Sequence, residues 1–218
     1  MLNNFKLLLF LNLILNSILI MKISILTFQE FNELDSLIVY GILNHVKKSN
    51  WQINICSPDK NITSMNNLKI NSHSDLSDIE KSDVVIVGSG MKTREIANDS
   101  NILNQIKLNP QKQIICSQCS GALILSKLSL LENIPVCTDL IHKKFVEESG
   151  VIVLDQPFYA SGNIASAGGC LSSQYLAFFV ISKILDIDNA IKAIYYFAPT
   201  GQKDIYVDMA ISNVKKYL

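Results

Sequence analysis

The four consecutive β-branched residues Val84-Val85-Ile86-Val87 limit the possible folds more than any other segment of this chain. A strand that is apolar on both faces must be covered on both faces, which is typical of a central strand in a parallel sheet. Similar apolar runs alternate with amphipathic stretches from residue 21 onward, as in β-α-β units. The sequence therefore predicts a flavodoxin-like α/β fold, doubly wound, with a mostly parallel sheet and helices on both faces.

The periodicity also places the individual elements. We expect strands over residues 22–28, 51–57, 83–87, 113–117, 151–154, 157–159 and 164–167. We expect helices over residues 33–48, 93–108, 120–131, 169–185 and 189–197. Short strands or loop are expected over residues 61–73, and one more helix over residues 199–218. Because no linker or internal repeat interrupts this pattern, residues 21–218 are predicted to form one domain.

Residues 1–20 form an apolar extension ahead of that domain. Residues 7–20 fall short of the ~20 apolar residues that a spanning helix needs, and Asn12 and Asn16 interrupt them. A small-x-small cleavage site does not follow them. We interpret the extension as a start-site artefact with Met21 as the true start, and a signal peptide or membrane anchor is the alternative. The first interpretation predicts a cytoplasmic protein without a membrane partner.

Charge and cysteine content narrow the classes of partner. Lysine plus arginine and aspartate plus glutamate both number 19, so nucleic acid is not an expected partner. An odd number of cysteines, five, in a core-rich chain favours a reducing compartment. Cys116 and Cys119 form a C-x-x-C, but without a second pair a structural zinc site is not expected, whereas a thioredoxin-like redox pair is conceivable. We predict neither a metal nor a cofactor.

Cys119 stands where a predicted strand runs directly into a predicted helix. Ser117 lies two residues before it and Gly121 two residues after it. This small-x-nucleophile-x-Gly spacing is that of a nucleophile elbow, in which the glycine lets strand and helix approach closely. The helix N-terminus is expected to lower the pKa of the thiol. The alternative is a cysteine that packs at a strand end.

Four segments resemble motifs of the ThiJ/PfpI family, within the class I glutamine amidotransferase-like superfamily. The family patterns F-P-G-F-x-x-L-D, V-P-G-G with T-R-E, V-C-T-G-A and G-N-x-x-T-A-G-G are matched, in this order, by residues 28–35, 87–95, 118–122 and 162–169. The resemblance covers residues 21 to about 197, and the first motif is similar to that of the isonitrile hydratase branch. It implies the same fold, a small-molecule substrate and a homodimer.

The resemblance gives Asp35 the position of the family's acidic residue, beside the cysteine. A protonated carboxyl there would donate a hydrogen bond to the thiolate or a proton to substrate. A structural role is also open, because Asn32 as N-cap and Asp35 at the third helical position resemble a capping pair. One residue can serve both purposes.

A backbone site for negative charge is expected beside Cys119. The N–H groups of Gly88, Ser89 and Gly90, together with that of Ser120, would form an oxyanion hole. An ordinary glycine turn is the alternative for the first three residues.

The chain also departs from the family. Where many members have a histidine in a T-T-H segment, it has Cys137-Thr138-Asp139, and the nearest histidine is His142. His142 is interpreted as a surface residue, with a displaced base as the alternative. A Cys–His–acid triad and protease activity are therefore not supported.

Two functions remain. The first is an isonitrile hydratase-like enzyme that uses Cys119 and Asp35 to add water to a small carbon–nitrogen or carbonyl compound. The second is a ligand- or redox-sensing module that kept the cysteine and lost efficient turnover. The missing histidine favours the sensor, whereas the elbow, the acid and the glycine loop favour the enzyme.

Overall fold

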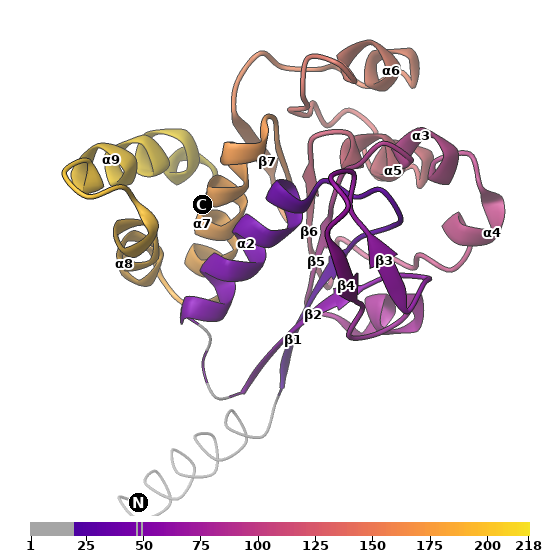
Figure 1. Cartoon of the computed structure of the whole chain (residues 1–218). Coiled ribbons are helices and arrows are strands. Elements are labelled where there is room, and N and C mark those ends of the chain that lie inside the picture. The colour runs from indigo at the N-terminus through magenta and orange to yellow at the C-terminus, as the bar shows by residue number, and fades with distance from the viewer. Residues whose placement is uncertain (1–19, 47, 49) are drawn as a thin grey trace, which may run out of the picture.

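The computed structural model describes residues 20–46, 48 and 50–218, and Figure 1 shows a sheet with helices on both faces. Six strands follow the order β2-β1-β5-β6-β8-β7, and every neighbouring pair is parallel except the edge pair β7 and β8. The strands are β1 Met21–Leu26, β2 Trp51–Cys56, β5 Val84–Val87, β6 Ile114–Gln118, β7 Phe158–Ser161 and β8 Ile164–Ala167. The predicted fold class is confirmed.

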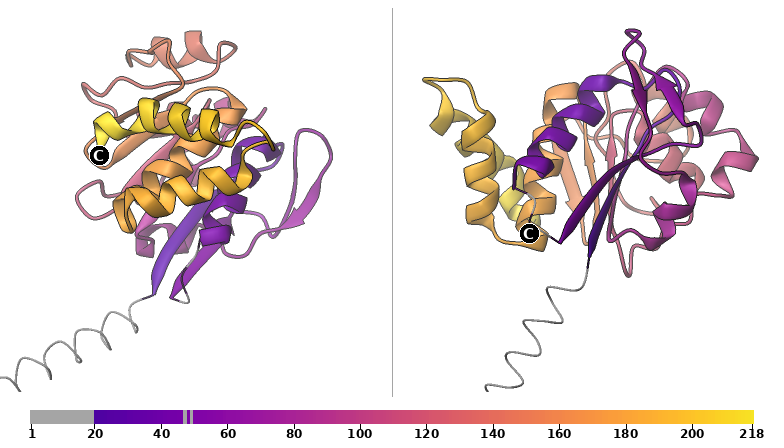
Figure 2. Two further views of the ribbon diagram at one scale, coloured as in Figure 1. Left: turned by 90° about the vertical axis from the view of Figure 1, so that its left-hand side faces the viewer. Right: turned by 60° about the horizontal axis from the view of Figure 1, so that its bottom comes forward.

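The helices cover both faces of this sheet. On one face lie α2 and α7, with α8 and α9 outside them, as both views in Figure 2 show. These are α2 Glu33–Val46, α7 Ser173–Ile184, α8 Ile187–Phe197 and α9 Lys203–Val214. The other face carries the 3₁₀ helix η1 Leu76–Lys81 and the helices α3 Thr93–Ile96, α4 Ser100–Leu103 and α5 Gly121–Lys127. The remaining elements are α6 Lys143–Glu148 and the 3₁₀ helices η2 Cys170–Ser172 and η3 Lys215–Tyr217.

The core consists of two layers, one on each side of the sheet. Val84 and Ile86 face α2 and α7, whereas Val85 and Val87 face α5. All four side chains are buried, so this strand is covered on both faces as its sequence predicts. Burial on both sides fixes the register of β5, because a shift by one residue would exchange the two layers.

The segment predicted as one helix over residues 93–108 is two short helices instead. The break falls at Asp99, whose carboxylate accepts hydrogen bonds from the N–H groups of Asn101 and Ile102 and caps a new helix, α4. A short acidic side chain that bonds nearby backbone groups competes with helix continuation. The prediction of a single helix was therefore wrong because a capping signal was overlooked.

Two other regions differ from the sequence-based expectation in detail. The strand predicted over residues 151–154 is reduced to an isolated bridge between Val136 and Val153, and α6 was not predicted. Residues 61–73 do contain short strands, β3 Asn61–Thr63 and β4 Lys69–Asn71, which form a separate antiparallel pair. The expected C-terminal helix is α9, followed by η3.

The apolar extension, residues 1–20, lies outside the described residues apart from Ile20. Within the part of the chain that the structure describes, every helix is too short or too polar to cross a membrane.

The topology brings the loops that follow β1, β5 and β6 to one edge of the sheet. The chain passes from β1 to its neighbour β2 on one side and returns to β5 on the other side of β1. The carboxyl ends of β1 and β5 therefore form the switch point at which ligands bind in open α/β sheets. The next strand along the sheet, β6, ends at Gln118, directly before Cys119.

Gly121 joins α5 to this edge. A Cβ atom at Gly121 would lie 2.5 Å from the carbonyl oxygen of Val87 and 2.8 Å from that of Gly88. Both neighbours are backbone atoms of a central strand and its loop, so they cannot rotate away. The first turn of α5 approaches β5 this closely only because residue 121 has no side chain.

We predict that Gly121→Ala lowers the free energy of unfolding by about 1–3 kcal/mol, the typical cost of overpacking. Gly41→Ala is the matched control, because a Cβ there would meet its nearest atom, in Phe197, at 3.9 Å. In the middle of α2 this control should stabilise by roughly 0.5–1 kcal/mol. Urea unfolding of both variants measures the difference, and equal effects would contradict the close approach.

Candidate active site

Cys119 occupies a strained turn between β6 and α5. Its φ angle is +46°, in the left-handed region that residues with a side chain seldom adopt. The N–H of Cys119 donates to the carbonyl oxygen of Ala167 at 2.8 Å, which holds the turn against the end of β8. Strain of this kind costs of order 1–3 kcal/mol and is found mainly at functional sites. The local geometry is that of a nucleophile elbow.

Asp35 lies in the first turn of α2 and is buried, with 1% of its surface exposed. The hydroxyl of Ser89, in the loop after β5, donates a short hydrogen bond to its carboxyl group. Asn32 caps α2, because its side-chain oxygen accepts from the N–H of Leu34 at 3.1 Å. The expected capping pair is thus only half present: Asn32 caps the helix, and the Asp35 carboxyl points to the loops at the sheet edge.

The carboxyl of Asp35 interacts with two thiols, those of Cys119 and Cys170. The Cys119 sulfur also accepts from the N–H of Gly169 and, at 3.5 Å, from the side-chain amide of Gln118. The same amide donates to the carbonyl oxygen of Gly169 at 2.9 Å. The sulfur is thus held between the end of β6 and the segment that follows β8.

The electrostatic environment of Cys119 differs from the expected one. Burial raises the pKa of its thiol, and the charges of Asp35 and Asp139 raise it further, while the Gly169 hydrogen bond opposes them. Only 4% of the residue is exposed. The expected lowering by the helix N-terminus was wrong: α5 has seven residues, and desolvation of the thiolate outweighs its dipole.

Asp35 itself is shifted toward the neutral form. Burial raises the pKa of its carboxyl group, and hydrogen bonds from Ser89, Cys170 and Cys119 only partly oppose this rise. A neutral carboxyl does not repel a thiolate and can donate a hydrogen bond to it. The protonation states of Asp35 and Cys119 therefore depend on each other. The Asp35 carboxyl keeps its proton to a higher pH than an exposed aspartate does.

The expected oxyanion loop has three free donors where four were predicted. The N–H of Gly88 donates to the carbonyl oxygen of Leu26 at 2.9 Å, so it is not available to a substrate. The N–H groups of Ser89, Gly90 and Ser120 make no hydrogen bond to another described residue. A shared hydroxyl links this loop to the elbow, because Thr93 donates to the carbonyl of Gly90 at 2.8 Å and lies 2.9 Å from the Ser120 hydroxyl.

Asp139 and His142 form a pair near the site. A ring nitrogen of His142, Nδ1, lies 2.9 Å from a carboxylate oxygen of Asp139. Burial would raise the pKa of Asp139, but the hydrogen bonds and charge of His142 hold it below its usual value. Asp139 stands where the motif resemblance places a histidine, and its negative charge raises the pKa of Cys119, so a carboxylate replaces an imidazole there.

A cavity of about 590 Å³ adjoins these residues. Thr138 and Asp139 line it on one side, and Gly168 and Gly169 on another. Its volume is within the range of small-molecule sites. Gly169 also acts on the Cys119 thiol, so the cavity lies next to the site, although neither Cys119 nor Asp35 lines it.

Three residues of the site were not predicted from the sequence. Gln118 donates a hydrogen bond to the Cys119 sulfur, and Cys170 interacts with the Asp35 carboxyl. Asp139 adds a negative charge near the Cys119 thiol. Asp139 could have been found, because it stands at the family's histidine position. Gln118 lies within one motif and Cys170 directly after another, but contacts between distant segments give them their roles.

A doubly wound α/β sheet with a cysteine at a strained elbow, next to a buried acid, defines a class of cysteine-centred proteins. The model of the DJ-1/PfpI family matches residues 21–183, so this chain belongs to the DJ-1/PfpI family. No match to a curated protein is found at a significant level.

Solved structures share the fold. A ThiJ/PfpI family protein from Pseudomonas syringae has a TM-score of 0.74 at 17% identity, over 91% of this chain and 89% of that one. Schizosaccharomyces pombe DJ-1 has a TM-score of 0.69 at 13% identity, over 82% and 99% of the two chains. Oxidized Toxoplasma gondii DJ-1 has a TM-score of 0.70 at 14% identity, over 81% and 97%.

The raised pKa of Asp35 predicts how stability depends on pH. Between the usual aspartate pKa of ~3.9 and the raised value, the folded protein binds a proton that the unfolded chain has lost, so its stability falls as pH rises. Asp35→Asn cannot titrate. Its stability relative to wild type should therefore increase with pH across this window, by about 1.4 kcal/mol for each unit by which the pKa is raised.

Urea unfolding of wild type and Asp35→Asn at a series of pH values measures this difference. Ser89→Ala removes a hydrogen bond that lowers the Asp35 pKa. It should therefore extend to higher pH the range over which the stability of the folded protein falls. A stability advantage of Asp35→Asn that grows as pH falls would show instead that the folded protein favours the carboxylate.

Proposed function

We propose that this protein is a cysteine-dependent hydratase of small carbon–nitrogen compounds, with isonitriles as its substrate class. The observation that carries the proposal is the buried carboxyl of Asp35 beside Cys119: it raises the pKa of the thiol, and its Oδ1 oxygen has no hydrogen-bond partner among the described residues. Together they place a nucleophile and a proton carrier side by side, as covalent hydration requires.

In the first half of the reaction, the Cys119 sulfur attacks the terminal carbon of the isonitrile. A carbon–sulfur bond forms, and a proton is delivered to the same carbon, giving a thioimidate. Asp35 supplies this proton when it is neutral, or carries the thiol's proton across when it is ionised. Either route conserves protons, because the pair begins with at least one.

In the second half, water adds to the thioimidate carbon. The carbon–oxygen bond forms, one water proton goes to the nitrogen, and the other goes to the Asp35 carboxylate left by the first half as the carbon–sulfur bond breaks to release the Cys119 thiolate. The product is an N-substituted formamide, so the net change is the addition of one water molecule. The free N–H groups of Ser89, Gly90 and Ser120 are proposed to stabilise the oxygen or nitrogen on which negative charge develops.

The charge of the site favours a neutral substrate. Asp139 already places a negative charge near Cys119, and an anionic substrate would add another to a buried space. An isonitrile carries no net charge, and its small carbon terminus can reach a thiol that is nearly covered. The cavity beside Gly169 has room for the rest of the molecule.

We expect the purified full chain to convert alkyl or aryl isonitriles to formamides, measured by NMR. Asp35→Asn should lower the turnover number by about 10²–10⁴-fold, the usual worth of general acid–base catalysis. Cys119→Ser should abolish turnover, because a hydroxyl is a much weaker nucleophile in the same position.

Cys56→Ser is the control for loss of a buried thiol. Cys56 lies in β2, where it bonds to Ser24 and Ser74, and this variant should keep wild-type turnover. A panel of α-oxoaldehydes run in parallel tests the carbonyl alternative. Absence of product with both panels would rule out the hydratase in favour of the second function.

That second function is a ligand- or redox-sensing module. The raised pKa of the Cys119 thiol leaves little thiolate for rapid turnover, which favours the ligand-sensing form of this module. The similar fold of Toxoplasma gondii DJ-1, described as oxidized, supports a redox role. We also propose a reducing compartment, the cytoplasm, in which the five free thiols would persist.

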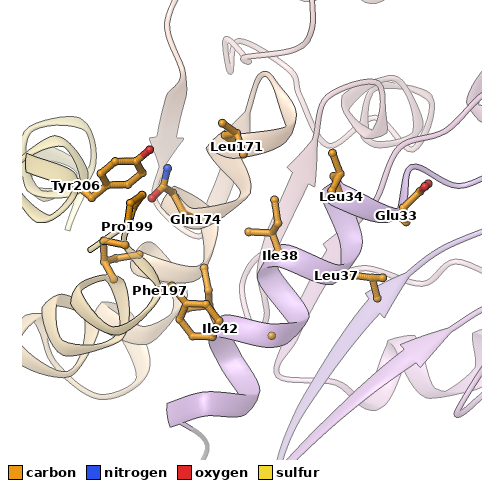
Figure 3. A pocket seen from close by; sticks show the side chains of 13 residues that line it. Glu33, Leu34, Leu37, Ile38, Ile42, Leu171, Gln174, Phe197, Pro199 and Tyr206 are labelled. Atoms are coloured by element: carbon orange, nitrogen blue, oxygen red, sulfur yellow. The ribbon is translucent and has the colours of Figure 1, made fainter. Parts of the chain in front are cut away.

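We further propose that the protein is a homodimer, the state that the family resemblance implies. An apolar groove of about 480 Å³ lies between α2, the start of α7 and the helices α8 and α9 (Figure 3). Leu34, Leu171 and Phe197 line it and are all exposed. A second copy that covered these side chains would remove apolar surface from water.

Leu171→Asp should shift the protein to a monomer in sedimentation velocity at high micromolar concentration, because it places a charge in the groove. Ile152→Asp is the matched control: both side chains are 68% exposed, but Ile152 does not line the groove. A wild-type monomer at that concentration would contradict the proposal, and so would an unchanged dimer in Leu171→Asp.

A further inference from the structure

Cys170 is a second thiol within the candidate site, and the hydratase chemistry does not use it. It is the first residue of η2, directly after Gly169. Its sulfur accepts a hydrogen bond from the side-chain amide of Asn32 at 3.2 Å and interacts with the carboxyl of Asp35. Its side chain is only partly buried. Burial raises the pKa of its thiol and so does the charge of Asp35, while the Asn32 hydrogen bond opposes the rise.

The backbone holds Cys170 close to the elbow. β6 and β8 are parallel neighbours, with Gln118 opposite Ala167, and such strands lie ≈ 4.7–4.9 Å apart. Beyond them, the N–H of Cys119 bonds to Ala167, and the side chain of Gln118 bonds to the carbonyl of Gly169. Gly169, directly before Cys170, is thus held against Gln118, directly before Cys119.

The two sulfurs converge on one group from these neighbouring segments. Both interact with the Asp35 carboxyl, and the Cys119 sulfur accepts from the N–H of Gly169. A disulfide requires Cα atoms about 4.4–6.8 Å apart, a separation typical of adjacent segments. The two thiols thus lie on adjacent segments that are tied together by the Gln118 and Cys119 hydrogen bonds.

The C-x-x-C partner of Cys119 has a different setting. Cys116 is wholly buried within β6 and packs in the core layer beneath α2 and α7. Burial raises the pKa of its thiol well above the usual value, without an opposing hydrogen bond. The sequence pattern suggests Cys116 as the redox partner of Cys119, whereas the structure favours Cys170.

We propose that Cys119 and Cys170 are a peroxide-reactive thiol pair that closes into an intramolecular disulfide. The proposal rests on Cys119 being the reactive thiol of the site, but not on isonitrile turnover. The oxidant is a hydroperoxide, which is small enough to reach a thiol that is nearly covered.

The chemistry has two steps. The Cys119 sulfur attacks the terminal peroxide oxygen; the S–O bond forms as the O–O bond breaks, the leaving oxygen takes up the thiol's proton, and the sulfur is oxidised to sulfenic acid. The Cys170 sulfur then attacks the Cys119 sulfur. The S–S bond forms as the S–O bond breaks, and the departing hydroxide combines with the proton of Cys170 to give water.

Asp35 has a defined part in the second step. Both thiols act on the pKa of its carboxyl, so a neutral Asp35 can give its proton to the departing hydroxide and take the Cys170 proton in return. The disulfide would also protect Cys119, because sulfenic acid that is not captured by a thiol proceeds to sulfinic acid, which is irreversible for most proteins.

The test treats the full chain with hydrogen peroxide, alkylates the remaining thiols and maps the peptides by mass spectrometry. We expect a peptide pair linked through Cys119 and Cys170 within a single chain, lost on treatment with dithiothreitol. In Cys170→Ser the link should be absent, and Cys119 should instead gain two oxygen atoms as sulfinic acid. Cys116→Ser is the matched control and should keep the link.

Three results would overturn the proposal. They are a link from Cys119 to Cys116, a link only between two chains, and equal accumulation of sulfinic acid in wild type and Cys170→Ser. Because the assay contains no isonitrile, it can succeed if the hydratase proposal fails. A chain that hydrates isonitriles but forms no link would reject only the thiol pair.

Discussion

The close contact between Gly121 and the backbone at Val87 and Gly88 is the constraint on which the site depends. It presses the start of α5 against the central strand, and the turn before it must then take the left-handed conformation of Cys119. That turn aims the sulfur at the edge where β1 and β5 part. α2 enters from the same edge, so Asp35 reaches the sulfur although the two residues are far apart in sequence.

Burial, more than any single partner, sets the chemistry of this site. A half-exposed cysteine at a helix N-terminus would be an acidic thiol, but here desolvation and two carboxyl groups raise the pKa of Cys119. Burial also raises the pKa of the Asp35 carboxyl group. Protons therefore stay on both groups, and reactivity depends on passing a proton between them. Asp139, at the family's histidine position, strengthens this tendency.

Much of the fold was predictable because its signals are local. The apolar run of β5, the small residues around Cys119 and the polar stretch that became β3 and β4 all carry their structure in a few neighbouring residues. The predicted helix over residues 93–108 failed for an equally local reason, the cap at Asp99. Burial and long-range contacts were not predictable in this way. The thiol pKa and the role of Cys170 depend on segments that meet only in the folded chain.

Adjacent residues of α2 face two different environments. Leu34 points into the exposed apolar groove, and Asp35 points into the candidate active site. A helix moves as a rigid body, so any displacement of α2 at the groove displaces the acid relative to the sulfur. If a second copy occupies the groove as proposed, it would press on the same turn of helix that carries the acid of the candidate site. The assembly state of the protein would then act as a control on its chemistry.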